Sequence, residues 1–97
     1  MKREDFIFIV GYDGDTAIVD RRAKKRYGRL STNQMADKGL FKAAFSSAIF
    51  SGLAEEMQYV LSSYNSGHGT TYRNAEELKR LFGVDEVRSD VTKTRAL

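Results

Sequence analysis

Apolar and polar positions divide the chain into an extended start, a long helical middle and a polar end. Residues 6–10 (FIFIV) are aromatic and β-branched, which predicts a β-strand with two apolar faces. Asp13-Gly14 follows, and then the second apolar run, 16–19 (TAIV). An Asp-Gly pair between two such runs predicts a β-hairpin whose two central turn residues both have positive φ.

A two-stranded hairpin alone is marginally stable in water, so we expect a third strand or a partner chain. Within the chain the candidates for a third strand are residues 70–72 and 84–91. Residues 89–97 are mostly polar and predict a flexible tail.

Helix signals surround the largest apolar block, residues 35–64. Ser31 with Gln34, and Asn74 with Glu77, have the spacing of capping boxes at helix N-termini. Glycine stops and the apolar spacing complete the prediction. The expected helices are 32–38, 40–51, 53–64 and 75–82, with a break at Gly52 and a loop over 65–71.

These elements predict a small α+β protein: one domain over residues 1–97, with an N-terminal β-hairpin packed against three or four short helices. Residues 20–28 fit two conformations. Asp20 is a suitable N-cap for a short helix with Ala23 and Tyr27 on one face. However, Arg21 and Arg22 would then meet an unfavourable helix dipole, so an extended continuation of the second strand or a loop fits the segment equally well.

The composition of the chain indicates the type of cellular compartment it occupies. The chain has no cysteine, which removes disulfides and thiolate metal sites and fits a reducing compartment. Its apolar runs are too short for a signal peptide or a membrane-spanning helix. We therefore expect a cytoplasmic protein that makes no membrane contact.

The net charge of +3 comes from one segment. Residues 21–29 (RRAKKRYGR) carry six basic residues and no acid, and the other 88 residues have a net charge of −3. Such a segment could neutralise phosphates, and its tyrosine could stack on a base. The candidate nucleic-acid-binding residues are Arg21, Arg22, Lys24, Lys25, Arg26, Tyr27 and Arg29. The alternative is a solvated connector whose charges meet nearby acids such as Asp13, Asp15 and Asp20.

Residues 31–51 also have the layout of a helix-turn-helix, with a turn at Gly39. The second helix would enter the major groove, but apart from Lys42, Ser46 and Ser47 it is almost entirely apolar. A recognition helix needs several polar side chains that reach base edges. We interpret residues 40–51 as a core helix.

Candidate chemistry elsewhere is sparse. Asp13 and Asp15 flank the turn glycine, where aspartate is preferred for conformational reasons, and no calcium loop follows. His68 between glycines could act as a general base, but no second histidine or cysteine exists to form a zinc site. We expect no catalytic residues, metal or cofactor, and an enzyme using His68 and nearby threonines is the least favoured class.

The leading hypothesis is therefore a non-enzymatic interaction or regulatory protein that self-associates as a homodimer or larger oligomer, or binds a protein partner. It rests on the apolar strand 6–10 and on more apolar stripes than a chain of this length easily buries. The alternative is weak, sequence-independent nucleic-acid binding through residues 21–29.

Overall fold

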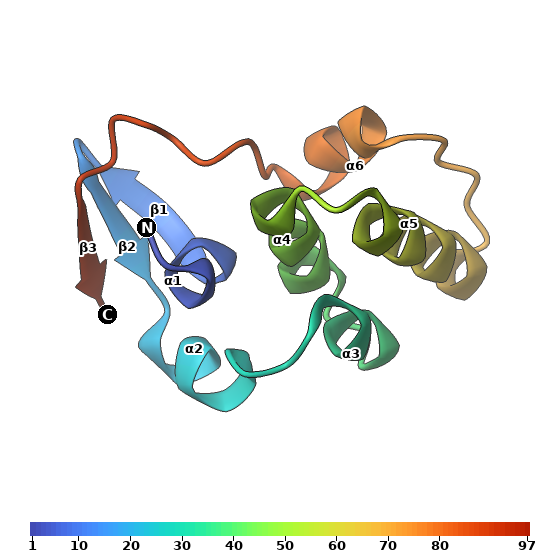
Figure 1. Cartoon of the computed structure of the whole chain (residues 1–97), viewed down its shortest axis with the longest axis horizontal. Coiled ribbons are helices and arrows are strands. Elements are labelled where there is room, and N and C mark those ends of the chain that lie inside the picture. Colours follow the sequence, from blue (N-terminus) through green and yellow to red (C-terminus); the bar gives the residue numbers. More distant parts are fainter. The chain divides into compact units, whose positions relative to one another are not determined.

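The computed structural model describes all residues from 1 to 97 and shows an α+β chain with a β-hairpin, a third strand and six helices (Figure 1). In chain order the elements are α1 (Arg3–Ile7), β1 (Ile9–Asp13), β2 (Thr16–Val19), α2 (Arg21–Tyr27), α3 (Thr32–Asp37), α4 (Phe41–Ser51), α5 (Ala54–His68), α6 (Ala75–Phe82) and β3 (Lys93–Ala96). The predicted α+β class and the hairpin are confirmed. None of the helices is both long enough and apolar enough to cross a membrane.

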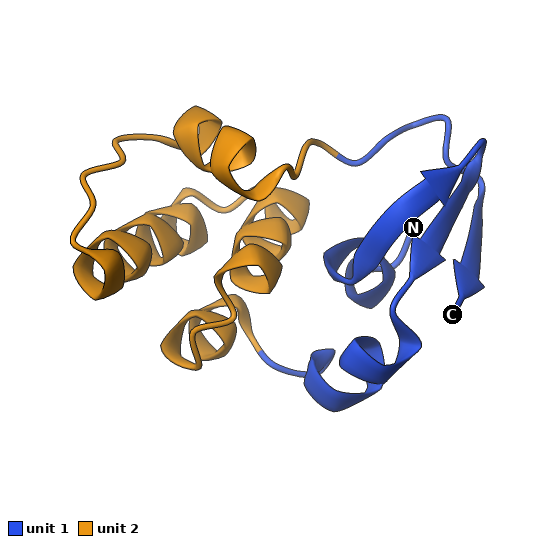
Figure 2. Ribbon diagram, turned by 180° about the vertical axis from the view of Figure 1, so that it is seen from behind, with its two compact units in different colours: residues 1–30, 87–97 blue, residues 31–86 orange.

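The chain forms two compact units (Figure 2). Unit 1 contains residues 1–30 and 87–97 and therefore holds the sheet, α1 and α2. Unit 2 contains residues 31–86 and holds α3 to α6. That both units act as a single domain stays a prediction from the sequence.

The sheet of unit 1 has the order β1-β2-β3. β1 and β2 run antiparallel with Asp13 opposite Thr16, so Gly14 and Asp15 form the connecting loop. Gly14 has a φ of +60°, and no residue other than glycine has a positive φ. The expectation of two positive φ values is wrong, because the hairpin closes one residue later than the Asp-Gly pair implies and needs glycine only at its first central position.

The first strand begins later than the sequence predicts. Phe6 and Ile7 lie in α1, and β1 starts at Ile9. Glu4 and Asp5 occupy the first turn of α1, where the helix dipole favours acidic side chains. β-Propensity mainly reflects packing of the side chain, so the surroundings of this short helix override it.

The hairpin has a third strand, but at neither segment that the sequence favoured. β3 runs parallel to β2 with Val19 opposite Ala96, and the N–H of Leu97 donates to the carbonyl of Val19 at 3.0 Å. Residues 93–96 are thus paired, where the sequence predicted a flexible tail. The side chains of β3 are all exposed, so its pairing depends on the main chain and leaves no apolar pattern to detect.

Local signals determine the helices of unit 2. The capping box at α3 is present, since the Ser31 hydroxyl accepts from the N–H of Gln34 at 3.1 Å and the Gln34 side chain accepts from the N–H of Ser31 at 2.9 Å. Asn74 caps α6 through the N–H of Glu77 at 3.1 Å. Gly52 has a φ of +69° and separates α4 from α5, so the predicted break is confirmed.

α5 continues past the predicted end at residue 64, and residues 65–68 are helical where a loop was expected. Asn65 ties this last turn to the segment before α6. Its Oδ1 accepts from the N–H of Tyr72 at 3.0 Å and from the hydroxyl of Thr70 at 2.8 Å. Its Nδ2 donates to the carbonyl of Tyr72 at 2.8 Å, so one side chain closes three hydrogen bonds.

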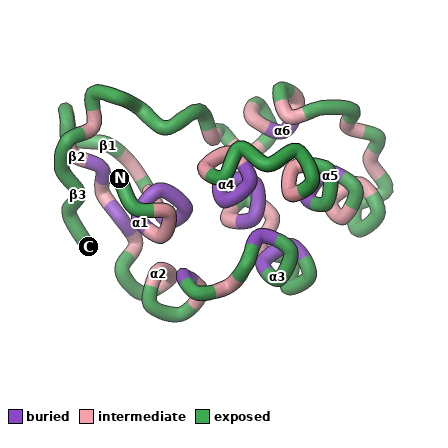
Figure 3. The backbone as a smooth tube through the Cα atoms, in the orientation of Figure 1, coloured by how far each residue is buried: buried purple, intermediate pink, exposed green.

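The core of unit 2 lies where α3, α4 and α5 pack against one another. Met35, Phe45 and Val60 are fully buried, one from each helix (Figure 3). Residues 44–48 of α4 are all buried. The interpretation of this helix as a core helix is therefore confirmed.

Candidate nucleic-acid interface

The basic segment folds as the helix α2, with the sequence RRAKKRY. Asp20 caps it, because its side chain accepts from the N–H of Ala23 at 3.1 Å. Of the conformations that the sequence left open for residues 20–28, the chain adopts the helix. No acidic residue lies in the first turn, so Arg21 and Arg22 do meet an unfavourable helix dipole.

Two side chains of α1 hold α2 in place. Asp5 forms an ion pair with Lys24, with 2.6 Å between Oδ1 and Nζ. Arg3 donates to the carbonyl oxygens of Gly28 at 3.2 Å and of Leu30 at 2.7 Å, just beyond the C-terminal end of the helix. α2 is thus fixed at its centre and at its end, independently of its other charges.

The cations of α2 lie on two different sides of the helix. Each residue advances a helix by roughly 100°, so four of the cations fall within an arc of roughly 140°. These four, hereafter the basic arc, are Arg21, Arg22, Lys25 and Arg26. All four are exposed, and none lies within 4.0 Å of a carboxylate oxygen. Lys24 falls on the opposite side of the helix with Ala23 and Tyr27, and all three are half-buried.

The basic arc contains two like-charge pairs one turn apart, Arg21 with Lys25 and Arg22 with Arg26. Each such pair destabilises a helix by about 0.2–0.5 kcal/mol. Neither pair has an acidic partner, and an anion placed between the members of a pair would remove the repulsion. Local charge conflicts that the fold leaves uncompensated are typical of functional sites.

Two further predicted residues flank the arc. Tyr27 is half-buried, and the Arg26 guanidinium lies 5.3 Å from the centre of its ring. A base could stack on that face only after Arg26 moves aside. Arg29 is exposed and lies beyond the end of α2.

The three aspartates considered as partners for this segment make other contacts. Asp20 caps α2, and Asp15 accepts from the hydroxyl of Thr92 at 3.1 Å. Asp13 lies 3.9 Å from the guanidinium of Arg95. None of these three aspartates forms an ion pair with residues 21–29, whereas Asp5 pairs with Lys24. No group of three or more His, Cys, Asp and Glu side chains is arranged to hold a metal ion.

Charge is distributed unevenly between the two units. Unit 1 has eleven basic and six acidic side chains, a net charge of +5. Unit 2 has five basic and seven acidic side chains, a net charge of −2. The basic arc therefore belongs to a unit that attracts anions as a whole.

His68, the candidate for acid–base chemistry, is exposed at the end of α5. Its ring stacks on Tyr64 with 4.1 Å between ring centres, and its Nδ1 lies 3.1 Å from the Tyr64 carbonyl oxygen. The hydroxyl of Thr70 donates to Asn65 instead. No hydroxyl group forms a hydrogen bond with the His68 ring, so the structure assembles no nucleophile–base pair there.

Arg3 and Asp5 position α2, but the sequence did not reveal them. They lie 19 to 27 residues from their partners, and nothing local marks such long-range contacts. The separation of Lys24 from the basic arc could have been read from the sequence. Placing residues 21–27 on a helix with 3.6 residues per turn puts Lys24 on the other side from the four arc residues.

No known protein family, curated protein or solved structure matches this chain. Four unpaired cations on one exposed side of a helix can contact several phosphate groups in a row.

Proposed function

We propose that the protein is not an enzyme and binds the phosphate backbone of nucleic acid through the basic arc. The observation that supports this most is the absence of any carboxylate within 4.0 Å of the four exposed cations. Exposed lysine and arginine side chains that meet phosphates release condensed counterions, which favours binding without reading sequence.

The size of α2 limits how much it can bind. Seven residues make a helix of about 10 Å, at about 1.5 Å per residue. This length spans about three steps at about 3.4 Å of rise per nucleotide in one strand of a duplex, and so reaches about four successive phosphates. The arc also contains only arginine and lysine, without the asparagine or glutamine that reads adenine. Binding should therefore be weak, indifferent to sequence and strongly dependent on salt.

Fluorescence anisotropy with a labelled single-stranded oligonucleotide tests the proposal. We expect binding at low salt with a dissociation constant within or below the range of about 10⁻⁶ to 10⁻⁴ M that is typical of non-specific contacts. Replacing all four arc residues with glutamine should abolish it.

A control removes two exposed arginines from unit 2, as Arg73→Gln with Arg80→Gln, and should leave the affinity unchanged. Circular dichroism of each variant checks that it is folded. No binding by the unmodified protein at low salt overturns the proposal, as does an equal loss of affinity in the control. A cytoplasmic location, where such ligands occur, is part of the proposal.

Self-association is a second candidate, supported by the edge of the sheet. β1 pairs only with β2, and its residues Val10 and Tyr12 are 57% and 41% exposed. An open edge strand with apolar side chains is a template for pairing with another chain. Sedimentation velocity should show a dimer that Val10→Lys disrupts, whereas Val87→Lys at another exposed valine has no effect. A monomer at all concentrations rejects this candidate.

A further inference from the structure

Unit 1 contains a pocket of about 340 Å³ next to α2. It is formed by residues from both chain ends of this unit, because α1, α2, β2 and β3 all contribute to its wall. Its lining includes Asp5, Val19, Arg21, Lys24, Lys25 and Thr94. Two members of the basic arc therefore line the pocket, and the other two do not.

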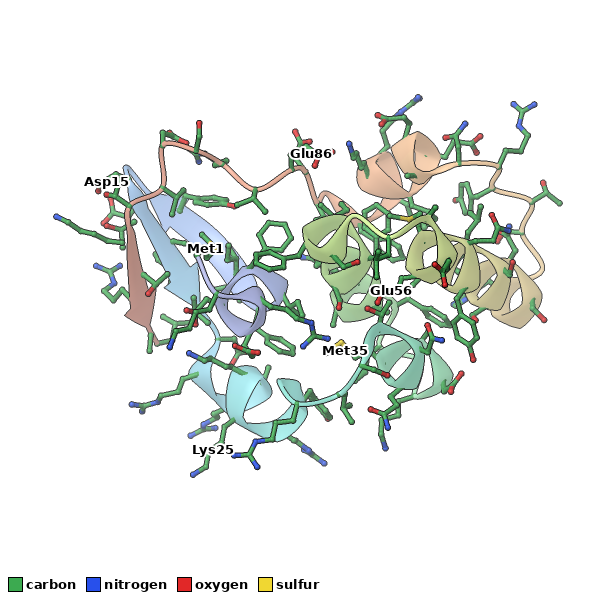
Figure 4. All side chains as sticks on the ribbon, in the orientation of Figure 1. Met1, Asp15, Lys25, Met35, Glu56 and Glu86 are labelled. Atoms are coloured by element: carbon green, nitrogen blue, oxygen red, sulfur yellow. The ribbon has the colours of Figure 1, made fainter.

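The pocket carries a surplus of positive charge. Its one carboxylate, Asp5, is 8% exposed and is already paired with Lys24 at 2.6 Å. Arg21 and Lys25 remain unpaired, and they lie one turn apart, where side chains are neighbours. Lys25 extends away from the ribbon of α2 (Figure 4). Two free cations at this spacing match a ligand group with two negative charges.

Two kinds of phosphate group in nucleic acid differ in their negative charge, and the pocket suits one of them better. A phosphate diester within a strand carries one negative charge, whereas a terminal phosphomonoester carries about −1.5 to −2 at pH 7 and has three acceptor oxygens. The hydroxyl of Thr94 adds a hydrogen-bond donor on the wall that β3 contributes, and Ala96, exposed on the same strand, adds a small apolar surface for a sugar or base. The volume lies near the lower limit of ligand pockets, about 300–1,000 Å³, which suits a single nucleotide.

We infer that this pocket binds the terminal phosphomonoester of a nucleic-acid strand, while Arg22 and Arg26 contact the diester backbone that follows. The inference rests on the proposed function, since it assigns the strand end to one side of the same helix. It divides the basic arc into two pairs with different roles.

The test compares three oligonucleotides of one sequence, with a phosphate at the 5′ end, at the 3′ end or at neither end, in competition anisotropy. We expect at least one of the two phosphorylated strands to bind about tenfold more tightly than the unphosphorylated strand. This is the effect of one additional charge-assisted hydrogen bond. In the pocket variant, Arg21→Gln with Lys25→Gln, this preference should fall to within about twofold, because both phosphate-binding charges are lost.

The control pair, Arg22→Gln with Arg26→Gln, removes the same charge at the same spacing but outside the pocket. It should weaken binding of all three strands equally and keep the tenfold preference. Thr94→Val, which removes no charge, should reduce the preference without changing the affinity of the unphosphorylated strand.

The outcomes separate the two proposals. Equal affinity for all three strands, or a preference that survives in the pocket variant, overturns the terminal-phosphate inference and leaves backbone binding in place. Absence of binding by any strand at low salt overturns both.

Discussion

Removal of Arg22 and Arg26 should halve the salt dependence of oligonucleotide binding, whereas removal of Lys24 should leave it unchanged. If each cation of the basic arc neutralises one phosphate of a single strand, log K falls by about 0.7 per cation per tenfold rise in salt, or about 2.8 in total. Without Arg22 and Arg26 the slope should be about 1.4.

Lys24 provides the comparison, because it carries the same charge on the same helix but forms an ion pair with Asp5. Lys24→Gln should keep the slope near 2.8. It should instead lower the free energy of unfolding by about 1 kcal/mol, since the carboxylate of Asp5 is left without its partner in a largely buried position. Anisotropy titrations from about 50 to 200 mM salt, with urea denaturation of each variant, measure both quantities.

Two results would refute this reasoning. The first is that Lys24→Gln flattens the salt slope by as much per charge as removal of Arg22 and Arg26. In that case the position of a cation around the helix does not determine whether it contacts phosphate. If neither variant changes the slope, the oligonucleotide binds elsewhere on the protein.

Three further predictions concern the framework of unit 2. Gly52→Ala should lower the free energy of unfolding, measured in urea, by about 1 kcal/mol, because a φ of +69° strains any residue other than glycine. The new Cβ would meet no atom within 4 Å, so the strain is the whole effect, and an unchanged free energy contradicts the left-handed conformation. Asn65→Ala should cost about 1–3 kcal/mol through the loss of three hydrogen bonds, and amide exchange at Tyr72 should accelerate. The hydrogen bond to Asp37 raises the pKa of Tyr59 above its ordinary value of 10.0, so this contact stabilises the fold below pH 10 and is lost as pH rises through the raised pKa. An NMR titration should show Asp37→Asn returning the pKa towards 10.0, and no change would argue against the contact.

Sequence patterns predicted the helices of unit 2 well because their signals are local. The capping box of Ser31 and Gln34, the cap at Asn74 and the break at Gly52 each act within one turn of the chain. Such signals specify where a helix begins or ends without reference to the rest of the fold.

Several sequence-based predictions were wrong in unit 1, where segments that are distant in the chain contact each other. Residues 6–10 have a strand composition, yet Phe6 and Ile7 are helical in α1, whose charged side chains contact α2. β3 has the sequence KTRA, and only its main-chain pairing with β2 makes it a strand. The basic residues of 21–29 are evident in the sequence, but their division into a paired Lys24 and an arc without ion pairs required the helix and Asp5.

Chemical-shift mapping by NMR tests most directly whether the basic arc is the binding surface. An unlabelled single-stranded oligonucleotide is titrated into ¹⁵N-labelled protein at low salt, and the shift of every assigned amide is followed. We predict concentration-dependent shifts in α2 and at Arg29, with no comparable change in α3 to α6, and loss of these shifts when the four arc residues are replaced. Shifts confined to unit 2, or none at all, would contradict the claim.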